Sequence, residues 1–415
     1  MNDSVDEQLK ALQAALSSKP PFCSGVLEVL PENLVLYYGK DGNLGRIDFA
    51  SASEDKLKHL TSVCDPATFG RNDRDVYDET YRKAGKLDAA YFAAKFDPQS
   101  SGLLDAIRGD LLEGDRERPI RAELYKLNVY GPGSFFKAHM DTPRGSDMFG
   151  SLVLVFPAAH EGGAIELRHE GAEWTFDSAT ALAASQKPSI GYVAFFSDVE
   201  HEVTPIRSGY RVTVTYNLYY AAESDAVLGG GDRPVARDPP ANEAAFKAGL
   251  RALLEDEAYM PDGGVLGFGL RHQYPCDRQD PTKNDLKQFE RRLKGSDAML
   301  LRVCRALGLE ASVQVVYKTY AGSALLDRVV DFEDRDDPEE DVVYWLKSTY
   351  NGMVLKSEYT DEEYEVSVSW VTPYARNDAM SLPFMTYGNE ADVTWAYIHL
   401  CLVVKVPAVP RAVNV

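Results

Sequence analysis

The chain has 415 residues and a formal net charge of −20, with 64 acidic against 44 basic side chains. Hydrophobic residues make up 45% and charged residues 26%, which is ordinary for a soluble globular protein large enough for two domains. The acidic balance and the lack of a basic cluster argue against a nucleic-acid partner. No apolar run reaches the roughly 18–20 residues of a membrane span, so no membrane partner is expected.

The first residues and the cysteines bear on the location of the protein. Residues 1–7 are polar and acidic, and are not expected to act as a signal peptide. The five cysteines lie far apart and form no CxxC pair, which fits neither a disulfide framework nor a zinc knuckle. We therefore expect a reduced, intracellular protein, in the cytoplasm or the nucleus.

Apolar residues recur at helical spacing in two segments of the first 130 residues. Residues 78–96 and residues 102–113 are each predicted to form an amphipathic helix. The apolar face of the first comprises Leu87, Ala90, Tyr91 and Ala94. The apolar face of the second comprises Leu103, Leu104, Ile107 and Leu111.

Short β-like runs dominate the chain from Ala122 to Tyr220. The clearest predicted strands are residues 152–156, 164–167, 192–196 and 211–219. Turn residues separate them, at 131–133, 162–163 and 208–209. Strands at this spacing predict an antiparallel sandwich or barrel.

Residues 221–241 are predicted to be a linker, because they hold three consecutive glycines and three prolines without periodicity. Beyond them the pattern is mixed α and β. Asn242 and Ser296 are each predicted to cap a helix, the second ending before Gly308. Residues 364–370 alternate apolar and polar side chains, as a half-buried strand does. Residues 331–341 hold eight acids, and we expect a solvated loop there rather than a cation site.

Two of the seven histidines lie in settings that indicate a metal site. His139 and Asp141 are two residues apart on a predicted strand, where alternate side chains point to one face. His201 follows a strongly apolar strand later in the chain. If the sheets bring it beside the first pair, two histidines and one carboxylate would bind one face of an iron and leave positions open for other ligands.

Arg211 lies ten residues after His201 and begins a predicted strand. Thr213 and Thr215 share its face of that strand. An arginine that points into a barrel needs an anionic partner to offset its desolvation, and a carboxylate matches the guanidinium fork. Arg207 is a competing candidate, but it lies in a predicted turn, where we expect it to be exposed.

In their order along the chain, these motifs resemble the catalytic core of the prolyl-4-hydroxylase-like branch of the Fe(II)/2-oxoglutarate dioxygenases. The resemblance extends from Tyr125 to Leu218, about a quarter of the chain. The matching segments are Tyr130-Gly131-Pro132-Gly133, His139-Met140-Asp141, Gly162-Gly163-Ala164-Ile165-Glu166-Leu167, Gly191-Tyr192-Val193-Ala194-Phe195-Phe196, His201-Glu202-Val203-Thr204-Pro205 and Gly209-Tyr210-Arg211.

The resemblance implies a mainly β fold with helices, built on a double-stranded β-helix (jelly-roll) core with flanking helices. We expect residues 1–220 to form the dioxygenase domain, with a catalytic core at about 122–220. Residues 221–241 would link it to an α+β C-terminal region, residues 242–415, for which the sequence indicates no role.

The resemblance also assigns site residues by position. The metal ligands, which carry the catalysis, correspond to His139, Asp141 and His201. The 2-oxoglutarate pocket corresponds to Arg211, as the partner of the far carboxylate, to Tyr130, and to the wall residues Val203 and Thr213. The chain departs from some family members at Leu154-Val155-Phe156, where those members have a second tyrosine.

The implied activity is hydroxylation of an aliphatic C–H bond, with Fe(II), 2-oxoglutarate and O2 as cofactor and cosubstrates. Ascorbate is expected to stimulate it, and 2-oxoglutarate would yield succinate and CO2. The substrate would be a prolyl or other protein side chain, or a small molecule. Asp141 argues against halogenation, which needs a small residue at that position.

Two other readings of the same fold stay open. The chain could be a scaffold or binding protein that has lost turnover, or a cupin-like metal protein without 2-oxoglutarate. The complete ligand set argues against the first reading, and Arg211 argues against the second.

Other residues near these motifs have ordinary structural explanations. His160 and His169 flank the Gly162-Gly163 hairpin and are expected to be exposed. Tyr125 and Lys126 are taken as ordinary strand residues. Cys304 is expected to be a small buried hydrophobe on a helix.

Overall fold

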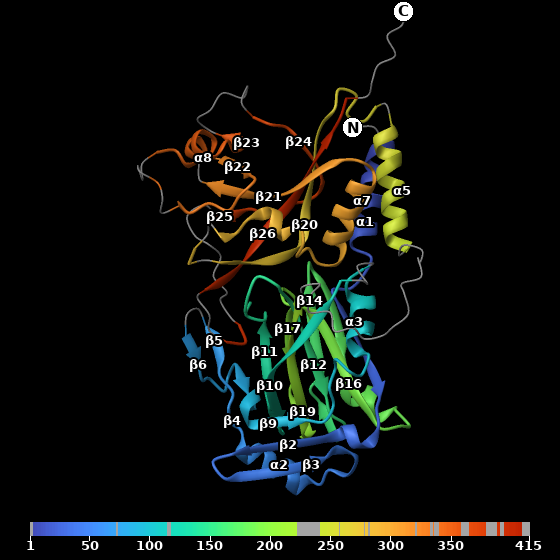
Figure 1. Ribbon diagram of the computed structural model, residues 1–415, viewed down its shortest axis with the longest axis vertical. Helices are drawn as coiled ribbons and strands as arrows, with labels where there is room; N and C mark the ends of the chain where they lie inside the picture. Colours follow the sequence, from blue (N-terminus) through green and yellow to red (C-terminus); the bar gives the residue numbers. More distant parts are fainter. Residues whose placement is uncertain are drawn as a thin grey trace, which may run out of the picture.

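The computed structural model describes residues 3–71, 74–113, 118–221, 241–256, 258–277, 279–280, 283–319, 322–332, 335, 340–357, 365–378, 388–390 and 394–408. Over these residues the chain is mainly β with some helices, arranged as two bodies stacked along the long axis (Figure 1). Most of the predicted linker, part of the acidic stretch and Tyr364 lie outside the described residues.

Two antiparallel sheets form the first body. One has seven strands: β1 (Phe22–Glu28), β16 (Ser189–Phe196), β12 (Met148–Val155), β19 (Arg211–Tyr220), β10 (Ile120–Tyr130), β8 (Gly85–Asp88) and β4 (Asp65–Pro66). The other has five: β15 (Ala172–Phe176), β14 (Ile165–His169), β17 (Glu200–Val203), β11 (Phe135–His139) and β7 (Arg82–Lys83). The predicted strands at 152–156, 164–167, 192–196 and 211–219 are thereby confirmed within a few residues at their ends.

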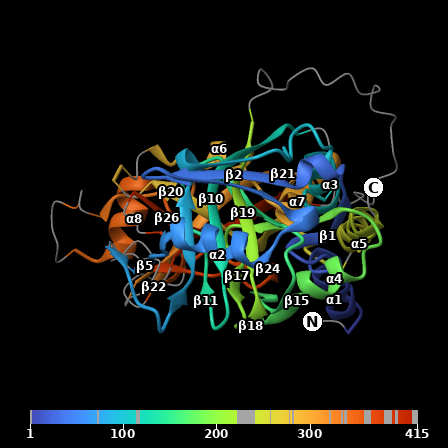
Figure 2. The same cartoon turned by 90° about the horizontal axis from the view of Figure 1, so that it is seen from below.

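Smaller elements surround these sheets. Three two- or three-stranded sheets comprise β2 (Val35–Lys40), β3 (Asn43–Asp48) and β9 (Phe92–Ala94); β5 (Phe69–Arg71) and β6 (Arg74–Val76); and β13 (His160–Gly162) and β18 (Ile206–Gly209). The helices are α2 (Glu54–Val63), α3 (Leu103–Leu111) and α4 (Ser178–Ala183), with 3-10 turns η1 (Pro31–Leu34), η2 (Phe49–Ser51) and η3 (Ala89–Tyr91). Figures 1 and 2 show β2, β3 and α2 at the end of the first body farthest from the second.

The predicted helix at 102–113 is confirmed as α3, whose apolar face is buried in the first core. The predicted helix at 78–96 is wrong, because β7, β8, η3 and β9 occupy that segment. Leu87 lies opposite Leu127 in the pairing of β8 with β10, and β9 pairs with β2. Pairing with neighbouring strands outweighs the weak helical period of this alanine-containing stretch.

In the described part of the chain, one sheet and five helices form the second body. Its strands are β23 (Met353–Ser357), β22 (Gly322–Leu326), β21 (Glu310–Thr319), β26 (Trp395–Val406), β20 (Gly264–Asp277) and β24 (Val368–Thr372), with β25 (Asn377–Asp378) beside β21. Its helices are α1 (Asp3–Leu16), α5 (Ala241–Glu255), α6 (Leu286–Phe289), α7 (Gly295–Ala306) and α8 (Val342–Tyr350). Figure 1 shows α1, α5 and α7 side by side.

Helix α1 packs with the second body, although it begins the chain. Its apolar residues Val5, Leu9, Leu12 and Leu16 belong to the same buried core as Phe246 of α5. Gln13 also donates a hydrogen bond of 2.6 Å to the backbone oxygen of Val371. The division into 1–220 and 242–415 stays a prediction, but the structure puts this first helix with the C-terminal residues.

The two predicted helix caps are wrong. Helix α5 already begins at Ala241, and Asn242 lies in its first turn, where its amide donates to Glu113 at 2.9 Å. Lys294 precedes α7, and the buried Ser296 hydroxyl lies inside that helix with no hydrogen-bond partner among the residues that the structure describes. Gly308 follows the end of α7 with a φ of +75°, as predicted.

The predicted strand at 364–370 is observed only at its end, because β24 begins at Val368. Among the described residues, none of the helices combines the length and apolar character that a membrane crossing requires.

Candidate metal centre

Two histidines and one aspartate converge between the two sheets of the first body. His139 is the last residue of β11 and lies directly opposite His201 of β17 in the strand pairing. Asp141 lies two residues beyond the end of β11, in the loop rather than on the strand where it was predicted. The nitrogen and oxygen donor atoms of the three buried side chains lie within 4.8 Å of one another.

Backbone hydrogen bonds orient the two imidazoles. Nδ1 of His139 donates to the backbone oxygen of Lys137 at 2.9 Å, and Nδ1 of His201 donates to that of Val199 at 3.1 Å. A carbonyl oxygen only accepts, so each Nδ1 carries a proton, and Nε2 is the ring nitrogen left to face a metal ion. Nε2 of His201 lies 3.9 Å from Oδ1 of Asp141.

Aromatic packing buries this pair of imidazoles. The His139 ring stacks on Phe136 at 3.6 Å, and the His201 ring lies 4.4 Å from that of Phe195. Burial, aided by the neighbouring His201, holds the pKa of His139 well below its ordinary value. His139 is therefore neutral at physiological pH, which is the form that binds metal ions.

Asp141 is held by side chains from both bodies. Its Oδ2 accepts a hydrogen bond from the Ser151 hydroxyl of β12. Its Oδ1 accepts one from the amide of Asn389, and its backbone oxygen lies 2.8 Å from the Tyr397 hydroxyl. Asn389 and Tyr397 belong to the C-terminal part of the chain, so the second body contacts the candidate metal centre directly.

Arg211 presents a buried guanidinium without a complete set of partners. The side chain is 1% exposed, and its Nε and Nη2 have no hydrogen-bond partner among the described residues. Burial lowers the pKa of Arg211 to about 10, so it stays charged at neutral pH. Buried polar groups are nearly always satisfied, so this cation indicates the place of an anionic ligand.

The predicted pocket residues line one cavity with the candidate metal centre. This cavity of about 60 Å³ is bordered by Arg211, Tyr130, Val203 and Thr213 as well as by the two histidines and Asp141. Val153 of β12 also lines it, one residue before the segment where the chain departs from its resemblance.

Gly163 makes room for the Arg211 side chain. Its φ is +72°, and a Cβ built on it would lie 2.9 Å from Cδ of Arg211 and 2.3 Å from Cδ1 of Ile206. A side chain there would strain the backbone and displace the guanidinium, which explains the glycine in this motif.

Sequence reasoning missed several residues of this cavity. Tyr125 and Lys126, taken as ordinary strand residues, both line it, beside the register shift in β10. Burial and neighbouring cations lower the pKa of Lys126 to about 8. Asn389 also lines the cavity, and no spacing in the sequence ties it to Asp141.

The remaining candidates lie elsewhere. Arg207 is exposed on β18, away from the residues that line the cavity. His160 is half-buried, and its Nδ1 donates to the backbone oxygen of Ala158 at 2.8 Å. His169 was expected to be exposed, but it is buried with Nε2 3.2 Å from Oδ2 of Asp198. Cys304 is fully buried in the second core, as expected.

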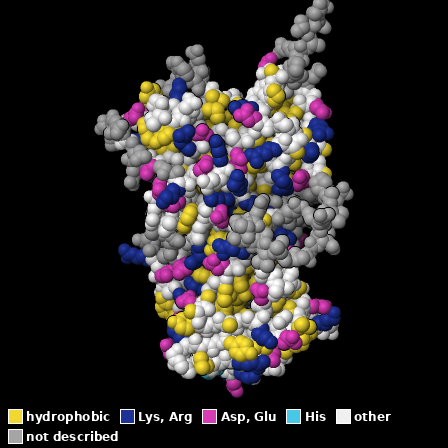
Figure 3. Space-filling model, viewed as in Figure 1, with side chains coloured by type: hydrophobic (Ala, Val, Ile, Leu, Met, Phe, Trp, Pro, Cys, Tyr) yellow, Lys and Arg dark blue, Asp and Glu magenta, His cyan; other side chains and the backbone are white. Residues whose placement is uncertain are grey.

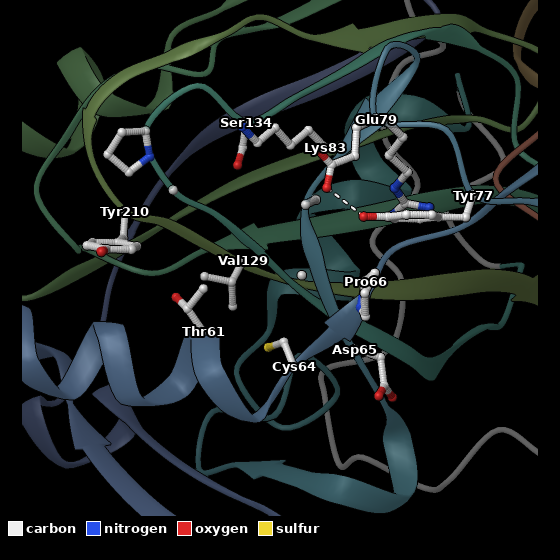
Figure 4. Close-up of a pocket in the computed structure, with 15 residues that line it drawn as sticks. Thr61, Cys64, Asp65, Pro66, Tyr77, Glu79, Lys83, Val129, Ser134 and Tyr210 are labelled. Carbon is white, nitrogen blue, oxygen red and sulfur yellow. Dashed lines mark hydrogen bonds between the residues drawn. The ribbon is translucent and has the colours of Figure 1, made fainter.

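A larger cavity of about 370 Å³ lies beside the first one and shares Arg82 with it. Figure 4 shows Cys64, Tyr77 and Lys83 on its walls, with the Tyr77 hydroxyl bonded to Glu79. Neither of the two possible metal-binding groups found among the described residues lies in this cavity. The converging metal-donor side chains therefore line the smaller cavity.

Comparisons with known proteins agree with the position of this site. Residues 125–219 match the family model of the 2OG-Fe(II) oxygenase superfamily, and they include the three donor residues and Arg211. No curated protein matches the chain significantly.

Several solved structures resemble the chain. A Pseudomonas putida prolyl-4-hydroxylase is 16% identical and aligns over 52% of this chain and 99% of its own, with a TM-score of 0.31. A Trichoplax adhaerens prolyl hydroxylase, solved with a hypoxia-inducible-factor peptide, is 15% identical over 56% and 98%, with a TM-score of 0.28. At these values the likeness supports no statement about activity. The family match shows that the segment from Tyr125 to Tyr219 is similar to the 2OG-Fe(II) oxygenase superfamily.

Proposed function

We propose that this chain is an Fe(II)- and 2-oxoglutarate-dependent dioxygenase that hydroxylates an aliphatic C–H bond. The observation that carries the proposal is the pairing of two features in one buried cavity. Three donor side chains converge within 4.8 Å, and beside them lies a buried arginine whose Nε and Nη2 have no partner among the described residues. Neither feature alone calls for both a metal and a carboxylate cosubstrate.

The donor set fits Fe(II). Two neutral imidazole nitrogens and one carboxylate oxygen on one side of an ion are the donor set of non-haem Fe(II) oxygenases, and they leave positions open on the other side. His139, His201 and Asp141 would hold the ion, which together with bound 2-oxoglutarate and O2 supplies the oxidising power for C–H hydroxylation. Ascorbate is proposed as a stimulant.

Arg211 would bind the far carboxylate of 2-oxoglutarate. A carboxylate would satisfy the two unpartnered guanidinium nitrogens and neutralise the buried charge. Tyr130, Val203 and Thr213 would form the walls of the pocket, since all three line the same cavity. The balanced reaction converts 2-oxoglutarate, O2 and R–H into succinate, CO2 and R–OH.

The two facing sheets of the first body support a double-stranded β-helix (jelly-roll) core as the finer fold assignment. Their strands are paired antiparallel throughout, and the proposed ligands lie between them. The α+β character of residues 242–415 is supported by the sheet and helices of the second body.

A protein or peptide side chain, such as a prolyl residue, or a small molecule is proposed as the substrate. One relative in the comparisons is a prolyl hydroxylase solved with a peptide. No nucleic-acid or membrane partner is proposed. On the face seen in Figure 3, Lys and Arg side chains are interspersed with Asp and Glu. We also propose a cytoplasmic or nuclear location, supported by the wide spacing of the five cysteines.

Succinate formation without an added substrate tests the proposal, because uncoupled turnover requires no knowledge of R–H. Wild type and His139→Ala would be incubated with Fe(II), ascorbate, O2 and 2-oxoglutarate. We expect succinate from wild type and none above background from the variant. If neither forms succinate and neither binds Fe(II) or 2-oxoglutarate, the proposal is wrong.

The competing functions predict different results in the same experiment. A scaffold that has lost turnover would form no succinate with any substrate. A cupin-like metal protein would bind Fe(II) but would not bind 2-oxoglutarate. The buried Arg211, whose Nε and Nη2 lack a hydrogen-bond partner within the described part of the chain, argues against it.

A further inference from the structure

The C-terminal segment Gly388–Glu390 docks onto the first body beside the proposed metal centre. Gly388 exchanges two backbone hydrogen bonds with Gly70 of β5, of 2.9 and 3.0 Å, and bridges to Met140. Figure 1 shows the segment as a short red piece between the two bodies. It thus lies beside the loop that carries Asp141.

Contacts of Glu390 also hold this segment on the first body. The Thr142 hydroxyl donates to the backbone oxygen of Glu390 at 2.6 Å. The Glu390 carboxylate accepts from the Tyr125 hydroxyl at 2.7 Å and forms ion pairs with Arg144 and, at 3.6 Å, with Lys126. The segment therefore has anchors on both sides of Asn389 that do not involve Asp141.

Asn389 makes two hydrogen bonds that together define its orientation. Its Nδ2 donates to Oδ1 of Asp141, and its Oδ1 accepts from the backbone N–H of Thr142 at 3.1 Å. A carboxylate only accepts and a backbone N–H only donates, so the amide has one consistent orientation. The side chain bridges the proposed ligand and the backbone of the residue after it.

The contact is made with the carboxylate oxygen that faces the histidines. Oδ1 of Asp141 is the atom 3.9 Å from Nε2 of His201, whereas Oδ2 accepts from Ser151 on the opposite side. With both oxygens held, the carboxylate cannot turn about its Cβ–Cγ bond. Without Asn389, Ser151 alone would hold it, and Oδ1 would be free to leave the donor set.

We infer that Asn389 is a positioning residue for Asp141, so that the second body completes the metal centre of the first. The inference rests on the proposed function, since it takes Asp141 as a metal ligand. Asn389 acts through Asp141 and does not itself contact the metal. It gives residues 242–415 a specific role, because the proposed centre is fully ordered only when Gly388–Glu390 is docked.

Anaerobic titration of the full chain with Fe(II) alone, without 2-oxoglutarate, tests this inference. The test variant is Asn389→Ala. Loss of a hydrogen bond that orients a metal ligand typically weakens metal binding by about 10–100-fold, and we expect a loss in this range. Thr142→Val is the matched control, because it removes a docking hydrogen bond and keeps the Asn389 amide. We expect it to change the affinity by less than about threefold.

Thermal unfolding without and with Fe(II) separates positioning from a merely structural role. A positioning role predicts that Asn389→Ala reduces the rise in Tm caused by Fe(II), because that rise follows metal affinity. A structural role would lower Tm equally in both conditions and leave the rise unchanged.

Three results of the Fe(II) titration would count against the inference. Wild-type affinity in Asn389→Ala overturns the inference and leaves the proposed function intact. Equal weakening in both variants overturns the role of the amide in favour of docking alone. If wild type binds no Fe(II), the inference and the proposed function both fall.

Discussion

Two clusters in this molecule have the same composition, two histidines and one aspartate. Only one of them is proposed to bind metal. His139, Asp141 and His201 form the first, and His169, Asp198 and His272 form the second. In each cluster the donor atoms lie within 4.8 Å of one another and all three side chains are buried. Residue types and distances alone therefore do not distinguish them.

The groups that surround each aspartate make the difference. Asp198 accepts from the Lys294 ammonium at 2.8 Å, from Nδ1 of His272 at 3.0 Å and from the backbone N–H of Gln273 at 3.1 Å. A fixed cation is therefore already paired with this carboxylate. Asp141 instead accepts from a hydroxyl and an amide, both neutral.

The second cluster has a structural consequence, since it joins the two bodies. Asp198 and His169 belong to the first body, whereas His272 and Lys294 belong to the second. The coulombic attraction of Lys294, together with the hydrogen bonds from His169 and His272, outweighs the burial penalty and holds the pKa of Asp198 well below its ordinary value. The ion pair stays charged and holds the bodies together.

Lys294→Met should produce the largest effect on stability, because it leaves the Asp198 charge buried without its cation. Removal of one partner of a buried ion pair typically costs about 3–5 kcal/mol of the free energy of unfolding. Urea unfolding measures this cost. Lys187→Met, which breaks an exposed pair with Glu28, serves as the control and should cost less than about 1 kcal/mol. Equal losses in the two variants would contradict the buried ion pair.

At the first cluster, Arg211→Met should weaken 2-oxoglutarate binding without lowering the free energy of unfolding. The dissociation constant of 2-oxoglutarate, measured anaerobically with Fe(II), should rise by about 100–1000-fold, since a charge-assisted carboxylate contact is lost. The free energy of unfolding without ligand should not fall, because the variant removes a buried charge whose Nε and Nη2 have no hydrogen-bond partner among the described residues. A destabilised variant with unchanged cosubstrate affinity would show that Arg211 is structural.

Acidification should weaken the second cluster through His272. Burial lowers the pKa of His272 to about 3, below its unfolded value of about 6.5. Between these values the unfolded chain binds the proton and the folded chain does not, so stability falls as the pH falls. The contribution is about 1.4 kcal/mol per pH unit. Urea unfolding between pH 7 and 5 should show a shallower pH dependence for His272→Gln, and an unchanged dependence would refute this.

Arg207→Ala should have the smallest effect. This exposed residue is the other arginine near the sequence motif, and it does not line the cavity. The KM for 2-oxoglutarate in succinate formation should stay within about twofold of wild type. A large rise there would transfer the role of carboxylate partner from Arg211 to Arg207.

The sequence predicted the first cluster because its members lie in short motifs on or next to β11 and β17, which pair in one sheet. Alternation along β19 put Arg211 on the same face as Thr213 and Thr215, and all three line the cavity. The confirmed strands follow from short β-like runs bounded by turn residues, a signal that lies within a few residues of the chain.

The second cluster and the docked segment could not be predicted in this way. Asp198 meets Lys294 and His272 only through the contact between the bodies, and Asn389 lies 248 residues from Asp141. A pattern that repeats over a few residues does not predict contacts between residues so far apart in the sequence. The wrong helix at 78–96 has a related cause, since its residues pair with β10 and β2, which lie apart from it in the sequence.

The proposed difference between the two clusters is tested most directly by the number of Fe(II) ions bound per chain. This number would be measured in wild type, His139→Ala and His272→Gln. Anaerobic equilibrium dialysis with metal analysis gives this number. We predict one ion per chain in wild type and in His272→Gln, and none in His139→Ala. An ion that persists in His139→Ala, or one that is lost in His272→Gln alone, would contradict the assignment of the metal centre to His139, Asp141 and His201.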